Sequence, residues 1–179
     1  RDEFEVNWAL NNSKKVRGET IACDSQLNTA SSLKNINSAI IYKNILNDTD
    51  LKYTINSTAI KEDIILNSKN APSSFTFDYE IKKLSYRRCE NGNIEIYSDS
   101  NPDSSVFTID KPYMYDAMGN FSDSVEMNIV ETKKGFQIVI IPNEEWINSS
   151  ERVFPITIDP TIITEQSASS IKDTTGVVS

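Results

Sequence analysis

The strongest constraint on the fold is an alternation of apolar and polar side chains with a period of two residues. Aromatic and aliphatic residues alternate with polar ones in segments 75–81, 94–97, 125–129, 136–140 and 154–158. Successive side chains of a β-strand point to opposite faces, so each segment predicts a strand with one buried and one wet face. Antiparallel sheets with one solvated face show this pattern.

Turn residues between these segments predict hairpins. Asn91-Gly92 separates segments 84–89 and 94–97, and Asn-Gly tolerates the positive φ angles that a two-residue hairpin turn needs. Lys133-Lys134-Gly135 joins the next pair of segments in the same way. About ten strands at this spacing predict an all-β fold, an antiparallel β-sandwich. The regular up-and-down repeat of a closed barrel is missing.

One short helix is expected near residues 144–148. Asn143 can accept a hydrogen bond from the first turn, and Glu144 and Glu145 suit the positive end of the helix dipole. We expect the following Trp146 to pack onto the end of the sandwich.

Composition divides the chain into three parts. Residues 1–38 are expected to hold N-terminal strands and a Ser/Asn-rich connection, and residues 39–161 the sandwich module. Residues 162–179 turn polar after Asp159-Pro160 and predict a linker or the start of a following module. The chain begins at Arg1 without a basic-then-apolar leader, so we expect a processed piece of a longer protein.

Charge and residue usage exclude several functions. The formal net charge is −8, and an acidic surface repels nucleic acids and anionic lipid, so no nucleic-acid partner is expected. No run approaches the about 18 apolar residues of a membrane-spanning helix, so membrane insertion is not expected. The chain has no histidine, which excludes a Ser-His-Asp or Cys-His site.

Three aromatic residues, Tyr113, Tyr115 and Trp146, are candidates for a glycan-binding surface, because rings with a polar handle suit sites that are partly wet. The alternative is ordinary packing in the core or across strands. Paired carboxylates such as Glu62-Asp63 and Glu144-Glu145 could serve a glycan hydrolase, but no recognisable pocket accompanies them.

Calcium is the one cofactor that the sequence suggests. Asp99, Asn101 and Asp103 have the spacing that opens a calcium-binding loop, but Ser104 stands where that loop needs glycine. The same residues are common in turns. Cys23 and Cys89 could form one disulfide in an exported protein; alternatively, Cys89 is a small buried apolar residue.

An ordered set of segments resembles a known family. The segments that carry the resemblance are 42–53, 60–66, 71–77, 91–97, 106–109, 112–119, 145–147 and 152–161. Together they resemble the N-terminal β module of secreted, wall-associated RHS-repeat and DNRLRE-domain-containing proteins of Gram-positive, clostridial-type bacteria. None of these segments is a catalytic motif.

This resemblance implies a non-catalytic structural and interaction module that positions or displays adjacent domains, in a protein whose downstream part often carries a polymorphic toxin. The expected location is secreted, at the cell wall, and the expected partners are cell-wall polysaccharide or neighbouring domains of the same polypeptide. The chain is then not an enzyme. The alternative is a carbohydrate-binding module, braced by calcium, and a more remote one is a glycan hydrolase.

Overall fold

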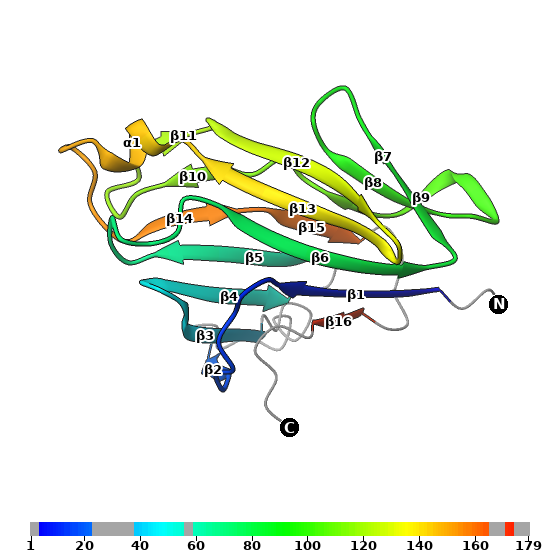
Figure 1. The fold of residues 1–179 in the computed structure, drawn as a ribbon, viewed down its shortest axis with the longest axis horizontal. Helices are drawn as coiled ribbons and strands as arrows, with labels where there is room; N and C mark the ends of the chain where they lie inside the picture. Colours follow the sequence, from blue (N-terminus) through cyan, green and yellow to red (C-terminus); the bar gives the residue numbers. More distant parts are fainter. Residues whose placement is uncertain (1–3, 23–37, 56–58, 165–170, 174–179) are drawn as a thin grey trace, which may run out of the picture.

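The computed structural model describes residues 4–22, 38–55, 59–164 and 171–173. These residues form two β-sheets and one short helix (Figure 1). The smaller sheet has the strand order β12 (Val125–Thr132), β13 (Gly135–Pro142), β6 (Phe75–Lys82), β1 (Glu5–Leu10) and β16 (Ile171–Asp173). All its pairings are antiparallel except that of β1 with β16.

The larger sheet is built around β5 (Ala59–Leu66). On one side of β5 lie β4 (Thr49–Ile55), β3 (Ser38–Leu46) and β2 (Glu19–Ala22). On the other side β5 pairs with both β14 (Ile156–Asp159) and β15 (Thr161–Thr164). Beyond β14 lie β10 (Tyr113–Tyr115) and β11 (Phe121–Ser122), and beyond β15 lie β9 (Asn101–Ile109), β8 (Ile94–Ser98) and β7 (Leu84–Arg88).

The predicted all-β sandwich is confirmed, with more strands than the expected ten or so. The described residues form sixteen strands, several of them only two to four residues long. Strands of two or three residues, such as β11 and β16, are too short to show a period of two, which is why the sequence did not reveal them. The smaller strands β10 and β11 matter here, because they complete the sheet face described below.

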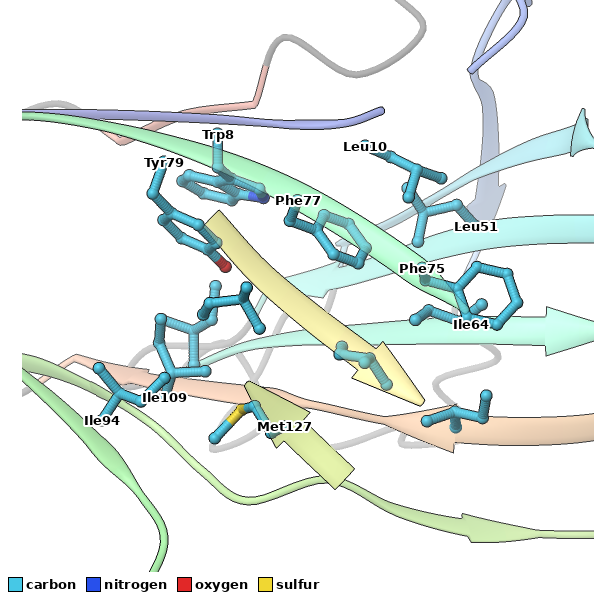
Figure 2. Close-up of a cluster of buried hydrophobic side chains, with 14 of the residues drawn as sticks. Trp8, Leu10, Leu51, Ile64, Phe75, Phe77, Tyr79, Ile94, Ile109 and Met127 are labelled. Carbon is cyan, nitrogen blue, oxygen red and sulfur yellow. The ribbon is translucent and has the colours of Figure 1, made fainter. Parts of the chain in front are cut away.

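The core lies between the two sheets and joins residues from both. Phe75 and Phe77 of β6 are 1% exposed, and Ile64 of β5 and Ile94 of β8 are 0% exposed. Figure 2 shows these side chains gathered between the strands, together with Trp8 and Met127. Burying one large apolar side chain contributes about 1.5–3 kcal/mol, so this interior is the main stabilising feature of the fold.

A polar contact also crosses the core. Trp8 Nε1 of β1 donates to Tyr53 Oη of β4 at 3.2 Å, and Tyr53 Oη donates to Glu62 Oε1 at 3.2 Å. Glu62 is 2% exposed and lies on the same face of β5 as Ile64. Because buried polar groups are stabilised by their hydrogen bonds, these two hydrogen bonds tie the smaller sheet to the larger one. Glu62 and Asp63 point to opposite faces of β5, so they do not form a carboxylate pair.

The predicted helix is confirmed as α1, Glu144–Asn148. Asn143 Oδ1 accepts a hydrogen bond from Trp146 N at 2.8 Å, which is the expected cap. The half-buried Trp146 packs against the core, as expected. Within the described residues, no helix has the length and apolar character that crossing a membrane would take.

The expected division of the chain into three parts stays a prediction. The proposed boundary at residues 161 and 162 falls inside β15, whose residues pair with β5 and β9 in the larger sheet. The pairing of Cys23 with Cys89 also stays a prediction, because Cys23 lies outside the described residues and Cys89 is half-buried at the end of the β7–β8 hairpin.

Candidate functional site

The outer face of the larger sheet gathers charged and aromatic side chains from four strands. Ile64 of β5, Ile158 of β14 and Met114 of β10 are 0% exposed and point into the core. Because side chains alternate along a strand, their neighbours point outward. The resulting outer-face cluster consists of Lys52, Lys61, Asp63, Tyr113 and Asp159.

Lys61 lies at the centre of the cluster. Its Nζ is 3.0 Å from Asp63 Oδ1 and 3.0 Å from Asp159 Oδ2, and Lys52 Nζ is 3.1 Å from Asp63 Oδ2. The contact of Lys61 with Asp63 Oδ1 is an ion pair without the angles of a good hydrogen bond. The cluster therefore balances two ammonium groups against two carboxylates and ties β4, β5 and β14 together.

Hydroxyl groups complete the surroundings of Asp159. Tyr113 Oη donates to Asp159 Oδ2 at 2.6 Å, and Thr161 Oγ1 donates to Asp159 Oδ1 at 2.8 Å. Asp159 is 1% exposed and Asp63 is 2% exposed, whereas the side chains of Lys52 and Lys61 are 32% and 35% exposed. The carboxylates thus lie beneath the lysines, and the ammonium groups are the charged atoms of the cluster that solvent reaches most easily.

The contacts shift the proton affinities of the donors upward. Partial burial lowers the pKa of Lys61, but its contacts with Asp63 and Asp159 outweigh this effect and raise the pKa above that of free lysine. The hydrogen bond to Asp159, together with burial, raises the pKa of Tyr113 to about 12. Both groups keep their protons at neutral pH, so neither can act as a general base. The Tyr113 proton is donated to Asp159, so the Lys61 ammonium is the group of the two that can also donate to an anion.

A third carboxylate lies next to the cluster. Burial and the nearby charge of Asp159 raise the pKa of Asp110. Asp110 Oδ1 accepts a hydrogen bond from Asn93 Nδ2 at 2.7 Å, which holds the end of β9 against the β7–β8 hairpin. Asp110 is half-buried and is a negative group that a bound anion would approach.

The turn after β10 is held by Asp116. Its Oδ1 accepts from Met118 N at 3.0 Å and from Asn120 N at 2.9 Å, and its Oδ2 accepts from Arg152 Nη1 at 3.3 Å. Burial alone would raise the pKa of Asp116. The hydrogen bonds from Asn120, Val153 and Met118 have the larger effect in the opposite direction, so the pKa is lowered. This network fixes the turn that carries β11 next to β10.

A hollow of about 740 Å³ lies between β12, β13 and the start of α1. Its lining includes Lys111, Asp123, Glu126 and Glu144. Among the described residues no three His, Cys, Asp or Glu side chains lie close enough together to hold a metal ion. The charged groups of this lining are one lysine and three carboxylates, so the hollow is more acidic than the outer-face cluster, which has two lysines and two carboxylates.

The aromatic candidates fall into two groups. Tyr113 and Tyr115 lie side by side on the outer face, with ring centroids 6.2 Å apart. Trp146 belongs to α1. The guanidinium group of Arg152, which follows the helix, lies 4.6 Å from the ring centroid of Trp146. The structure therefore brings two of the three candidates together and gives Trp146 a separate cation–π partner.

The calcium candidates lie at the start of β9. Asp99 Oδ1 accepts a hydrogen bond from Ser85 Oγ at 2.6 Å, while Asn101 and Asp103 are exposed residues of β9 itself. Calcium binding at these three residues stays a prediction.

Lys52, Lys61 and Asp159 were not among the site residues predicted from the sequence. The alternation in segments 59–66 and 156–159 places Lys61, Asp63 and Asp159 on outward faces, and this signal could have been used. It could not show that β14 pairs with β5, because that pairing joins strands far apart in the chain.

The comparison with known proteins finds relatives that share the name WapA. The chain is 31% identical over 167 residues to the tRNA nuclease WapA of Bacillus subtilis strain 168, which covers 89% of this chain and 7% of that protein. It is 30% identical over 140 residues to the tRNA3(Ser)-specific nuclease WapA of Bacillus spizizenii and to the tRNA(Glu)-specific nuclease WapA of Bacillus subtilis subsp. natto, covering 74% of this chain. The chain thus spans 6–7% of the length of these relatives. No protein-family model and no solved structure matches the chain.

These relatives correct four expectations. The assignment to an RHS-repeat and DNRLRE family is wrong, because the relatives are tRNA nucleases. The same finding contradicts three further expectations: a non-catalytic module, a protein that is not an enzyme, and the absence of a nucleic-acid partner. The relatives are named as nucleases that act on tRNA. The segments behind the resemblance carry no catalytic motif, and the acidity of a chain that spans 6–7% of these relatives does not reveal what the relatives act on.

Two other expectations hold in a coarser form. The relatives come from bacteria, and their nuclease names are compatible with the expected toxin and with a cell-wall or extracellular location. The expected carbohydrate-binding and RHS-repeat features have no support among the relatives.

Proposed function

We propose that this chain forms part of a bacterial protein that cleaves tRNA. The observation that carries the proposal is the identity of 31% across 89% of the chain with a protein named tRNA nuclease. Because the matched segment is 7% of that relative, the activity is proposed for the whole protein of which the sandwich is a part.

The outer-face cluster is compatible with a polyanionic substrate. Cleavage of RNA requires stabilisation of the charge that develops on the phosphate, and ammonium groups with their protons in place provide it. Lys52 and Lys61 present such groups to solvent, while the Tyr113 hydroxyl donates its proton to Asp159 beside them. A base that activates the attacking oxygen is a separate requirement, which neither lysine nor tyrosine meets here.

We infer further that the protein acts as a secreted toxin associated with the cell wall. A nuclease directed at tRNA stops translation in any cell that it enters, so export removes it from the cell that makes it. The test is fractionation of the producing bacterium, with antibodies raised against residues 1–179. Signal in the wall and medium fractions supports export, and signal confined to the cytoplasm contradicts it.

The proposed cleavage is tested with purified full-length protein and total bacterial tRNA. The products are separated on a denaturing gel, with and without a divalent cation. Discrete tRNA fragments are expected, together with the loss of full-length tRNA. Intact tRNA under both conditions would refute the proposal. The 179-residue chain, assayed in parallel, shows whether the sandwich alone supports cleavage.

A further inference from the structure

Three aromatic rings form a continuous patch on the outer face of β10 and β11. Tyr113 lies between the other two, with ring centroids 6.2 Å from Tyr115 and 5.3 Å from Phe121. Phe121 is the cross-strand partner of Tyr115, so both side chains lie on the same face of the sheet. We call Tyr113, Tyr115 and Phe121 the aromatic patch.

Packing against the protein does not account for Phe121. This side chain is 61% exposed, although β11 is hydrogen-bonded to β10 as the edge strand of the larger sheet. Its backbone position is well held, because the Asp116 network fixes the turn that leads into β11. A rigidly placed and exposed phenylalanine ring beside two tyrosines forms a platform on which a flat ligand can stack.

The aromatic patch is continuous with the exposed lysines. Lys61 Nζ lies 5.9 Å from the ring centroid of Tyr115, and Lys52 shares the carboxylate of Asp63 with Lys61. The lysine side chains are 32% and 35% exposed, whereas Asp63 and Asp159 are 2% and 1% exposed. A ligand at this face therefore meets rings and ammonium groups first, with the half-buried Asp110 as the opposing charge nearby.

We propose that this face of β10, β11 and β5 binds unpaired nucleotides of an RNA strand, with bases stacked on Phe121 and Tyr115 and phosphates held by Lys61 and Lys52. Single-stranded nucleic acids are bound by aromatic side chains beside cationic groups in this way. The inference rests on the proposed function for the identity of the ligand, since the relatives are named for acting on tRNA. The unpaired segments of a folded RNA are where bases are free to stack on protein rings.

Binding is measured by fluorescence anisotropy of a labelled oligouridylate of about 12 nucleotides, a length within the range that such surfaces cover. The protein is residues 1–179, and a duplex RNA of equal length is the comparison. Saturable binding of the single strand is expected, with weaker binding of the duplex. No saturable binding of the single strand, or equal binding of the duplex, would overturn the proposal.

Two variants with matched controls assign the contacts. Phe121→Ala should weaken binding about fivefold or more, and Phe121→Trp should retain it, because stacking needs a ring. Lys52→Gln should also weaken binding. Lys134→Gln removes the same charge from the turn between β12 and β13, where the Lys134 side chain is 74% exposed, and should leave binding unchanged. Equal effects of Lys52→Gln and Lys134→Gln, or no effect of Phe121→Ala, would contradict the assigned site.

The two proposals fail separately. If the full-length protein cleaves tRNA but residues 1–179 do not bind RNA, the proposed binding face is refuted and the proposed function stands. If residues 1–179 bind single-stranded RNA specifically but the full-length protein does not cleave tRNA, the proposed function is refuted and the binding face stands.

Discussion

Lys61 Nζ lies 3.0 Å from Asp159 Oδ2 on the outer face of the larger sheet, joining β5 to the last residue of β14. The Asp159 side chain is fully buried and also receives hydrogen bonds from Tyr113 and Thr161. One carboxylate therefore fixes the positions of β5, β10 and β15 around the candidate site. The relationship predicts that Asp159 stabilises the fold as well as the arrangement of the lysine and tyrosine donors.

Replacing Asp159 by Ala should reduce the free energy of unfolding by about 1–3 kcal/mol, because Tyr113 and Lys61 lose a buried acceptor. The partial exposure of Lys61 keeps the loss at this size, since solvent screens the ion pair. Urea denaturation followed by tryptophan fluorescence measures the change. The control is Lys134→Gln at an exposed ion pair, where the expected change is below about 0.5 kcal/mol. Equal midpoints for the two variants would contradict the role of Asp159.

Alkaline pH should weaken the fold through Tyr113 and Lys61. Both pKa values are raised in the folded protein, Tyr113 to about 12, so their stabilisation is present below the unfolded pKa values. It is lost as the pH rises from about 10, the pKa of an unperturbed tyrosine, through the folded values. An ultraviolet titration of the phenolate checks this. The pKa of Tyr86 is also raised, by burial and by Glu131, so the test is a difference: the late part of the wild-type titration should be smaller in Tyr113→Phe. An unchanged titration curve in that variant would refute the assignment.

Acid should weaken the fold through Asp116. Its folded pKa is lowered, so its stabilisation is present above the unfolded pKa and is lost as the pH falls through the folded value. The loss should begin near pH 4, around the pKa of an unperturbed aspartate, which is about 3.9. Asp116→Asn should therefore be less stable than the wild type at neutral pH and should lose less stability on acidification. Thermal unfolding from pH 7 to pH 3 measures both slopes; parallel curves would contradict the prediction.

The core should respond to truncation far more than the aromatic patch. Phe77 is 1% exposed between the sheets, and Phe77→Ala should cost about 3–5 kcal/mol through lost burial and the cavity that it leaves. Phe77→Leu is the milder variant if the alanine form does not fold. Phe121→Ala, at a side chain 61% exposed, should change stability by less than about 0.5 kcal/mol. A large loss in Phe121→Ala would show that this ring supports the fold instead of facing a ligand.

Local patterns in the sequence predicted the local parts of the fold. Asn91-Gly92 marks the β7–β8 hairpin, the alternation around Lys133-Lys134-Gly135 marks β12 and β13, and Asn143 caps α1 as expected. These features depend on neighbouring residues, so a single chain shows them.

The candidate site depended on contacts that the sequence does not show. Tyr113 and Tyr115 were singled out as aromatic residues, but their neighbours Lys61 and Asp159 come from strands brought together only by the pairing of β14 with β5 and β10. Glu62 and Asp63 illustrate the same limit, since adjacency in the sequence places them on opposite faces of one strand.

The most direct test of the account is cleavage of total bacterial tRNA by the purified full-length protein, with the fragment ends mapped by sequencing. Full-length tRNA is expected to disappear, with cuts at defined positions in one or a few tRNA species. Its relatives named for tRNA3(Ser) and tRNA(Glu) motivate the expectation of such selectivity. Intact tRNA after prolonged incubation, with and without divalent cations, would contradict the central claim.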